Sequence, residues 1–162
     1  MSSVRFASLL LSAIWIGGLA ILGGVAAPTV FAVLQSHDPV AGRTLAGELF
    51  GAMLWKFQQI LWATGALQCL LLGVRAALGP RPRRVKLQLL VLIGMLAASS
   101  YSAIVITPQI DAIRSSSTTT IASLADTDPV KREFGMLHGA SNGLLALAFA
   151  GALTLFWFDS RE

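Results

Sequence analysis

Two histidines and the polar residues near one of them have the most recognisable chemistry in this sequence. His138 is followed by Ser141 and Asn142, three and four positions later, so the three side chains leave a helix from adjacent positions. A histidine at membrane depth is expected to point into a bundle or a wet cavity, where it can bind a ligand. His138 is therefore the first candidate for a ligand site. The alternative is a histidine that fastens helices by a hydrogen bond to a carbonyl.

A soft-metal site would combine imidazole and thioether groups. His37, Met53, Met136 and His138 all fall on the same predicted side of the membrane, and both ligand types suit copper(I). The spacing argues against a compact site, because Met136 and His138 are two residues apart and face different directions on a helix. His37 is equally explained as a solvated loop residue. The cofactor stays open, with copper as the metal to test first.

Haem and hydrolytic catalysis lack their parts. A haem held by two histidines needs both at membrane depth, and only His138 qualifies. A mixed ligand set with Met53 or Met136 stays open, without a pattern that supports it. No serine, histidine and acid set can be assembled, and Glu48, Asp111 and Glu133 suit rim charges or ion pairs better than a paired acid and base. The sequence does not predict an enzyme. Gln58, Gln59, Gln68 and the serines within residues 99–102 either line a polar path or make interhelix hydrogen bonds.

The elements that must position these residues are apolar helices. Hydrophobic residues make up 55% of the 162 residues and charged residues 12%, against about 25% charged in soluble domains. Four apolar blocks have about the 20 residues that a spanning helix needs; they cover residues 6–34, 57–78, 87–107 and 134–158. The prediction is an all-α, integral membrane four-helix bundle, a single domain in which a loop at residues 79–86 joins hairpins 1–79 and 87–162.

The distribution of charge predicts the orientation. The side with both termini and the central loop has seven basic and two acidic residues, a net charge of +5, and the opposite side has five basic and six acidic residues, a net charge of −1. By the positive-inside rule both termini are cytoplasmic, in a bacterial-type inner membrane. The loop's basic residues therefore mark topology and contact lipid, and we expect no nucleic acid partner; these residues are Arg81, Arg83, Arg84 and Lys86.

Capping residues and prolines predict how the helices begin and bend. Asp38-Pro39 and Asp128-Pro129 each place an N-cap before a proline at the first helical position. Residues 40–56 form an amphipathic extension of the second helix, which either stands above the membrane or lies along its surface. Pro28 removes a helical hydrogen bond, so we expect a bend there.

Small residues recur at helical spacing on the first and fourth helices. In lipid, such stripes let helix backbones approach closely. We expect them to contact helices of this chain, of a second copy or of another membrane subunit. The glycines in question are Gly17, Gly24, Gly135, Gly139 and Gly143.

The two halves of the chain are similar to each other. The segment that starts at Pro28 resembles the one that starts at Pro108, and Phe50-Gly51 resembles Phe134-Gly135, at offsets of 80 and 84 residues. Because each half starts and ends on the same side, a duplication would produce parallel repeats.

A family resemblance spans nearly the whole chain. It rests on these segments: Ala27-Pro28-Thr29-Val30-Phe31, Ala41-Gly42, Leu49-Phe50, Thr107-Pro108-Gln109-Ile110, and Phe134-Gly135-Met136-Leu137-His138 with Ser141 and Asn142. The chain resembles a four-helix membrane group, a domain of unknown function, allied to the bacterial copper-resistance protein CopD and including the eukaryotic transmembrane protein linked to cisplatin resistance. The resemblance implies a four-helix membrane protein, a loose association with metal or metallodrug handling, and a set of signature positions. These are Pro28, Phe50, Pro108, Phe134, His138 and Asn142. The first helix lacks the histidine of haem-binding relatives, which argues further against haem.

Two functional hypotheses follow. In the first, the protein binds or moves a metal ion or small ligand at its outward face, through His138 and Asn142 with Ser141, Met136, Met53 and His37 as additions. In the second, it is a non-catalytic accessory subunit whose glycine stripes dock against a larger membrane complex.

Overall fold

The fold is known from a computed structural model that describes residues 3–78, 84–117 and 120–161. Over these residues the regular structure is helical, and four helical rods are long and apolar enough to cross a membrane: Ser3–His37, Ala41–Leu78, Val85–Ser116 and Pro129–Arg161. The predicted all-α, four-helix membrane bundle is confirmed. Each rod extends beyond its predicted apolar block, because polar residues continue the helix at the ends.

Two of the rods are composite. The first consists of α1 (Ser3–Ile21), a π-helical turn at Leu22–Ala26 and α2 (Ala27–His37). The second is the single helix α3 (Ala41–Leu78). The third consists of α4 (Val85–Tyr101), a π-helical turn at Ser102–Ile106 and α5 (Thr107–Ser116). A short 3₁₀ turn at Ile121–Ser123 precedes the last rod, α6 (Pro129–Arg161).

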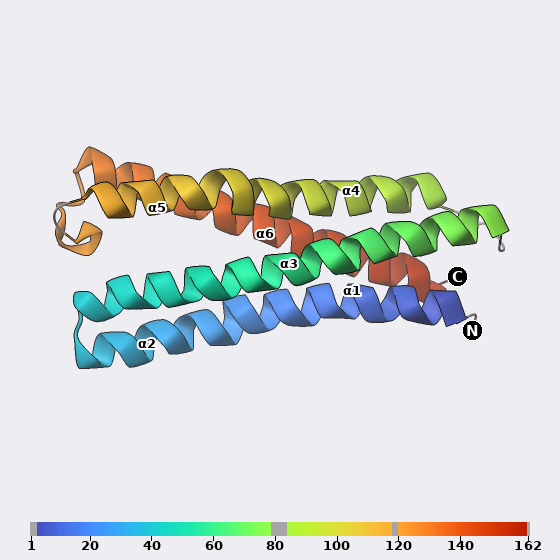
Figure 1. The fold of residues 1–162 in the computed structure, drawn as a ribbon, viewed down its shortest axis with the longest axis horizontal. Coiled ribbons are helices and arrows are strands. Elements are labelled where there is room, and N and C mark those ends of the chain that lie inside the picture. Colours follow the sequence, from blue (N-terminus) through green and yellow to red (C-terminus); the bar gives the residue numbers. More distant parts are fainter. Residues whose placement is uncertain (1–2, 79–83, 118–119, 162) are drawn as a thin grey trace.

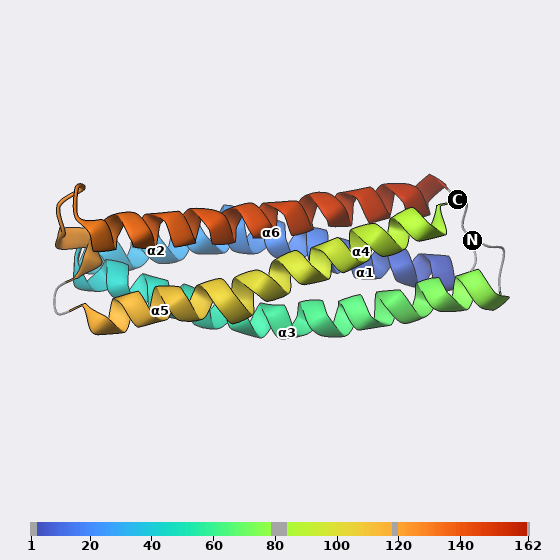
Figure 2. The same ribbon diagram turned by 90° about the horizontal axis from the view of Figure 1, so that it is seen from above.

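The rods run antiparallel in a closed ring (Figures 1 and 2). The helix α1 packs against α3 and α6, and α4 packs against the same two helices. One end of the bundle holds both chain termini, the last turn of α3 and the first turn of α4, and it is called the terminal end. The opposite end, with the α2–α3 and α5–α6 connections, is called the far end.

The bundle is taller than a bilayer core. In α3, residues 57–74 carry no charge, and these 18 residues rise about 27 Å, close to the roughly 30 Å of hydrocarbon. The rest of α3 towards the far end, residues 41–56, adds about 24 Å of helix. Because α3 is one continuous helix, the predicted amphipathic extension stands in line with the span. It does not turn onto the membrane surface.

Tight contacts close the middle of the bundle. Trp15 is fully buried at 0% exposure, in a cluster with Leu61, Leu92 and Met95. Three glycines let side chains of neighbouring helices approach their backbones: an added Cβ would contact Phe57 at Gly18, Leu96 at Gly65 and Met95 at Gly151. Because these positions have no Cβ, the three side chains lie directly against the glycine backbones.

The five glycines that the spacing selected are different ones. An added Cβ would meet nothing within 4 Å at Gly17, Gly24, Gly135, Gly139 or Gly143. None of them makes a close helix contact inside this chain, so for intrachain packing the prediction is wrong. Spacing alone does not tell which side of a helix faces the bundle. A role towards another chain stays a prediction.

Both prolines follow a π-helical turn. In the first rod the amide of Ala27 donates to the carbonyl of Leu22, five residues earlier, and Pro28 follows directly. In the third rod the amide of Thr107 donates to Ser102 in the same way, before Pro108. Each proline lacks the N–H of a regular helical hydrogen bond, and the helix continues past it through a wider π-helical turn.

The predicted start of α6 at Pro129 is confirmed, whereas α3 begins at Ala41, two residues after Pro39, with Asp38 still capping it. Asp38 Oδ1 accepts the backbone N–H groups of Val40 and Ala41, both at 2.8 Å. Asp128 Oδ1 accepts that of Val130, also at 2.8 Å. These bonds satisfy helix-start donors that have no intrahelical partner.

Candidate functional site

A buried ion pair at the terminal end is the most polar feature inside the bundle. Arg75 Nη1 lies 2.6 Å from Asp159 Oδ1, and the two side chains are only 10% and 7% exposed. Arg75 is on the last turn of α3 and Asp159 on the last turns of α6. A charge taken out of water is tolerated when an opposite charge and hydrogen bonds replace the lost hydration. The pair therefore joins α3 to α6 at the edge of the apolar slab, the layer of the bundle that contains the uncharged residues 57–74 of α3.

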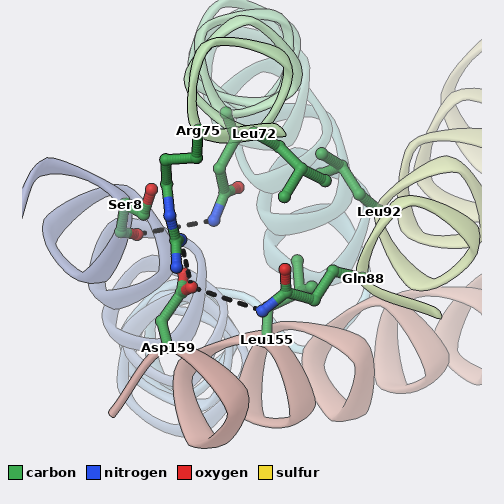
Figure 3. A pocket seen from close by; sticks show the side chains of 8 residues that line it. Ser8, Leu72, Arg75, Gln88, Leu92, Leu155 and Asp159 are labelled. Carbon is green, nitrogen blue, oxygen red and sulfur yellow. Dashed lines mark hydrogen bonds and ion pairs between the residues drawn. The ribbon is translucent and has the colours of Figure 1, made fainter. Parts of the chain in front are cut away.

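Neighbouring helices complete the shell of the pair. Gln88, on α4, donates from Nε2 to Asp159 Oδ1 at 3.4 Å, and Figure 3 shows Arg75 and Gln88 converging on Asp159 from two sides. Arg5, on α1, donates from Nε to the carbonyl of Asp159 at 2.6 Å and from Nη2 to that of Ser160 at 2.7 Å. The last carbonyls of a helix lack intrahelical partners and carry partial negative charge. Arg5 therefore caps the end of α6, and all four rods meet at Asp159.

A small cavity lies beside the pair. Its volume is about 10 Å³, and its lining is mixed: Ser8, Gln68, Leu72, Arg75, Gln88, Leu92, Leu155 and Asp159. This volume is about what one water molecule needs, so no organic substrate fits. Gln68 donates from Nε2 to Ser12 Oγ at 2.6 Å, while its buried Oε1 has no hydrogen-bond partner. A water in the cavity would supply the missing donor.

Further polar pairs continue along the bundle axis. Each joins two helices, and most are buried. The bonds are Trp15 Nε1 to Thr64 Oγ1 at 3.0 Å, Gln58 Nε2 to Ser99 Oγ at 3.2 Å, Trp62 Nε1 to Ser100 Oγ at 2.8 Å, and Ser102 Oγ to Ser141 Oγ at 2.8 Å. Of the predicted polar residues, Gln58, Gln68, Ser99, Ser100 and Ser102 make interhelix hydrogen bonds. Gln59 is exposed. Trp15, Leu61, Leu92 and Met95 pack as an apolar layer in the same interior.

The predicted ligand residues do not converge. On α6, Ser141 points into the bundle and is 8% exposed, whereas His138 and Asn142 are exposed. This differs from the expectation that a histidine at membrane depth turns inward. The His138 ring stacks on Phe134, with centroids 6.2 Å apart and planes 4° from parallel. The side chain that faces inward is Ser141, and its hydroxyl is hydrogen-bonded to that of Ser102.

The other candidate ligands lie on different helices. His37 ends α2 with its Nδ1 2.9 Å from the carbonyl of Val33. Met53 is half-buried on α3, and Met136 is 70% exposed on α6. Among the described residues, no three His, Cys, Asp or Glu side chains lie close enough together to hold a metal ion. His37 and His138 therefore belong to no such group.

The basic loop is described only in part. Arg81 and Arg83 lie outside the described residues. Arg84 and Lys86 are exposed at the start of α4, and the Arg84 guanidinium lies over the Phe158 ring, with Cζ 5.2 Å from its centroid.

The Arg75 and Asp159 site was missed from the sequence. Both residues were counted only as charges that report topology. The available signal was two opposite charges at the ends of apolar helices, since a charge inside such a helix requires a partner. Their separation of 84 residues hid the pairing.

Fold and site together define an integral membrane four-helix bundle closed at one end by a buried ion pair and a helix cap. The profile of a domain of unknown function, DUF4149, matches residues 10–119, more than half of the chain. The chain belongs to this family. The match covers Arg75 and Gln88 and ends before α6. No curated protein and no solved structure matches the chain significantly, so the predicted alliance with the copper-resistance and cisplatin-resistance proteins has no support from these comparisons.

Proposed function

We propose that this protein is an assembly subunit that docks other membrane-spanning helices through the outward faces of α1 and α6. The observation that carries the proposal is the open space over Gly17, Gly24, Gly135, Gly139 and Gly143. Without apolar burial to drive helices together in lipid, close backbone approach is what holds them, and small residues permit it.

A polar residue beside the α6 stripe supports the proposal. Asn142 is exposed on the same helix as Gly139 and Gly143. It lies 17 residues from Asp159, which places it about 26 Å along the helix and near the opposite edge of the apolar span. An amide in contact with lipid tails is costly, and a partner helix would offer it a hydrogen bond. Either a second copy or a different membrane subunit can supply that helix.

Site-specific photo-crosslinking tests the proposal. A photoreactive residue at Gly139 or Gly17 should crosslink to a membrane protein in native membranes. Leu70 and Leu90, exposed at 62% and 66% on α3 and α4, are the matched control positions, and there we expect crosslinks to lipid only. Equal crosslinking at all four positions, or none at the glycines, contradicts the proposal.

A substitution separates docking from folding. Gly139→Leu combined with Gly143→Leu fills the stripe, and since an added Cβ at either site meets nothing within 4 Å, the bundle itself should stay intact. We expect the variant to purify with normal helicity and without its partner. A variant that keeps its full set of partners would overturn the proposal.

Ligand binding at the far end is a second candidate. The observation in its favour is that the exposed His138 ring is engaged by stacking on Phe134, which leaves its nitrogens for a metal ion or polar ligand. Purified protein should then bind copper(I), and His138→Ala should lower the affinity. Unchanged binding in His138→Ala sinks this candidate.

We also propose a membrane orientation and an internal duplication for this protein. We place both termini in the cytoplasm, on the charge asymmetry described above. We also infer a duplicated hairpin, supported by the two π-helical turns at Leu22–Ala26 and Ser102–Ile106, each directly before the segment with Pro28 or Pro108, at the same offset of 80 residues as the sequence match.

A further inference from the structure

Cations and aromatic rings gather around the last turn of α6. The Arg161 guanidinium lies over the Trp157 ring with Cζ 3.8 Å from its centroid, and Arg84 lies over Phe158 at 5.2 Å. Arg84 precedes α4 and Arg161 ends α6, so the cluster forms where these two packed helices meet at the terminal end. Arg84, Trp157 and Arg161 are all exposed.

Positive charge predominates among the described residues of this cluster. Among the described residues of the terminal end, Asp159 is the one carboxylate, and it is buried against Arg75. No ion pair within the described residues engages Arg84, Arg161 or the nearby Lys86. A guanidinium stacked on a ring keeps its N–H edges directed outward, and these edges match phosphate oxygens. The cluster therefore presents oriented donors and positive charge.

Apolar surface continues directly from the cations. Trp157 is 53% exposed and Phe156 39%, and on the first turns of α4 Leu87 is 42% and Leu90 66% exposed. Trp at the end of an apolar span marks the membrane interface. A free phosphate would use the cations alone, whereas a phospholipid would use both surfaces.

We infer that Arg84, Arg161 and Trp157 bind the headgroup phosphate of an anionic phospholipid, with its acyl chains along the exposed apolar residues of α4 and α6. Basic pockets between spanning helices hold anionic headgroups in this manner. The site lies at the opposite end of α6 from Gly135 and Gly139, so it stands or falls independently of the docking role.

Native mass spectrometry of the full-length protein in detergent tests the site, with phosphatidylglycerol and phosphatidylcholine as probes. Each cation removed should weaken phosphatidylglycerol binding about fivefold, so Arg84→Gln combined with Arg161→Gln should weaken it about thirtyfold. Trp157→Ala should weaken it about two- to fivefold through the lost stacking. Arg43→Gln combined with Arg132→Gln, two exposed cations of the far end, is the matched control and should change binding less than about twofold.

Three results would overturn the inference. The first is equal loss in the far-end control, which would show a general effect of charge. The second is phosphatidylcholine binding as tight as phosphatidylglycerol binding. The third is displacement of the lipid by excess inorganic phosphate, which would identify a free anion as the ligand. Circular dichroism of each variant verifies that the bundle is folded. We expect folded variants because all the substituted side chains are exposed.

Discussion

At the scale of residues, Asp159 is the position on which the bundle depends most. It accepts from Arg75 and Gln88 through its carboxylate, and its backbone carbonyl accepts from Arg5. Three helices thus direct donors at one residue of the fourth. Removing one member of a buried ion pair is far more costly than replacing both, because the remaining charge loses its compensation.

Asp159→Ala should lower the free energy of unfolding by about 3 kcal/mol. Arg75→Met combined with Asp159→Leu should recover most of that loss, since it leaves no buried charge. Unfolding of each variant in mixed micelles, followed by circular dichroism, provides the measurement. If the double variant is as unstable as Asp159→Ala, the buried charge is not the cause.

Residue types alone placed the candidate site at the far end of the bundle, near His138, whereas the most polar buried residues lie at the terminal end. His138 attracted attention because histidine is rare here, but the helix turns it outward and turns Ser141 inward. His138 and Ser141 are three positions apart, so their side chains leave the helix 300° apart in rotation. Because apolar residues lie on all sides of the helix, its sequence does not show which of the two directions faces the bundle. The long-range pairs were beyond reach for the same reason, because Arg75 and Asp159 are brought together only by the closure of the ring.

At the scale of elements, most of the architecture could be predicted. Apolar length set the four spans, and aspartate before proline set the starts of α3 and α6. The π-helical turns were not predicted, because Pro28 and Pro108 announce a missing hydrogen bond without saying whether the helix bends, breaks or widens. The glycines divide in the same way: spacing identifies stripes, and only the packed structure distinguishes the tight positions from the open ones.

Gly42 is a tight position and Gly51, on the same helix, is an open one. An added Cβ at Gly42 would collide with the backbone carbonyl of Leu34, whereas at Gly51 it would meet nothing within 4 Å. Gly42→Ala should therefore destabilise the protein by about 1 to 3 kcal/mol, as α2 and α3 are forced apart. Gly51→Ala should stabilise it by up to about 1 kcal/mol through helix propensity. Chemical unfolding of both variants checks the opposite signs.

The connection before α6 has its own titration. Lys131 lies 2.8 Å from Asp126 Oδ1, and its hydrogen bond and positive charge lower the pKa of Asp126 from the ordinary value of 3.8. With the pKa lowered in the folded state, this pair supports the connection at neutral pH and stops doing so as the pH falls through the lowered pKa. Lys131→Gln should return the pKa of Asp126 towards 3.8, as followed by carboxyl-carbon NMR. An unchanged titration would show that the contact does not persist in solution.

At the scale of the whole molecule, the charge distribution and the antiparallel ring make one prediction about orientation. Both termini and the α3–α4 loop should face the cytoplasm, and the α2–α3 and α5–α6 connections should face outward. In a Cys69→Ser background, a membrane-impermeant thiol reagent should label Ser36→Cys in intact cells. Ser3→Cys, which is also exposed, should react only after permeabilisation. The reverse pattern would invert the proposed topology.

The cap of α6 by Arg5 has a consequence for how the protein is made. Arg5 and its acceptor on Asp159 are 154 residues apart, and Arg75 precedes the same residue by 84. At about 5 to 20 residues per second of synthesis, Arg75 enters the membrane roughly 4 to 17 seconds before its carboxylate exists. Until then Arg75 cannot form its ion pair with Asp159. The contacts that join α1, α3 and α4 to Asp159 can therefore form only after the end of α6 has been synthesised.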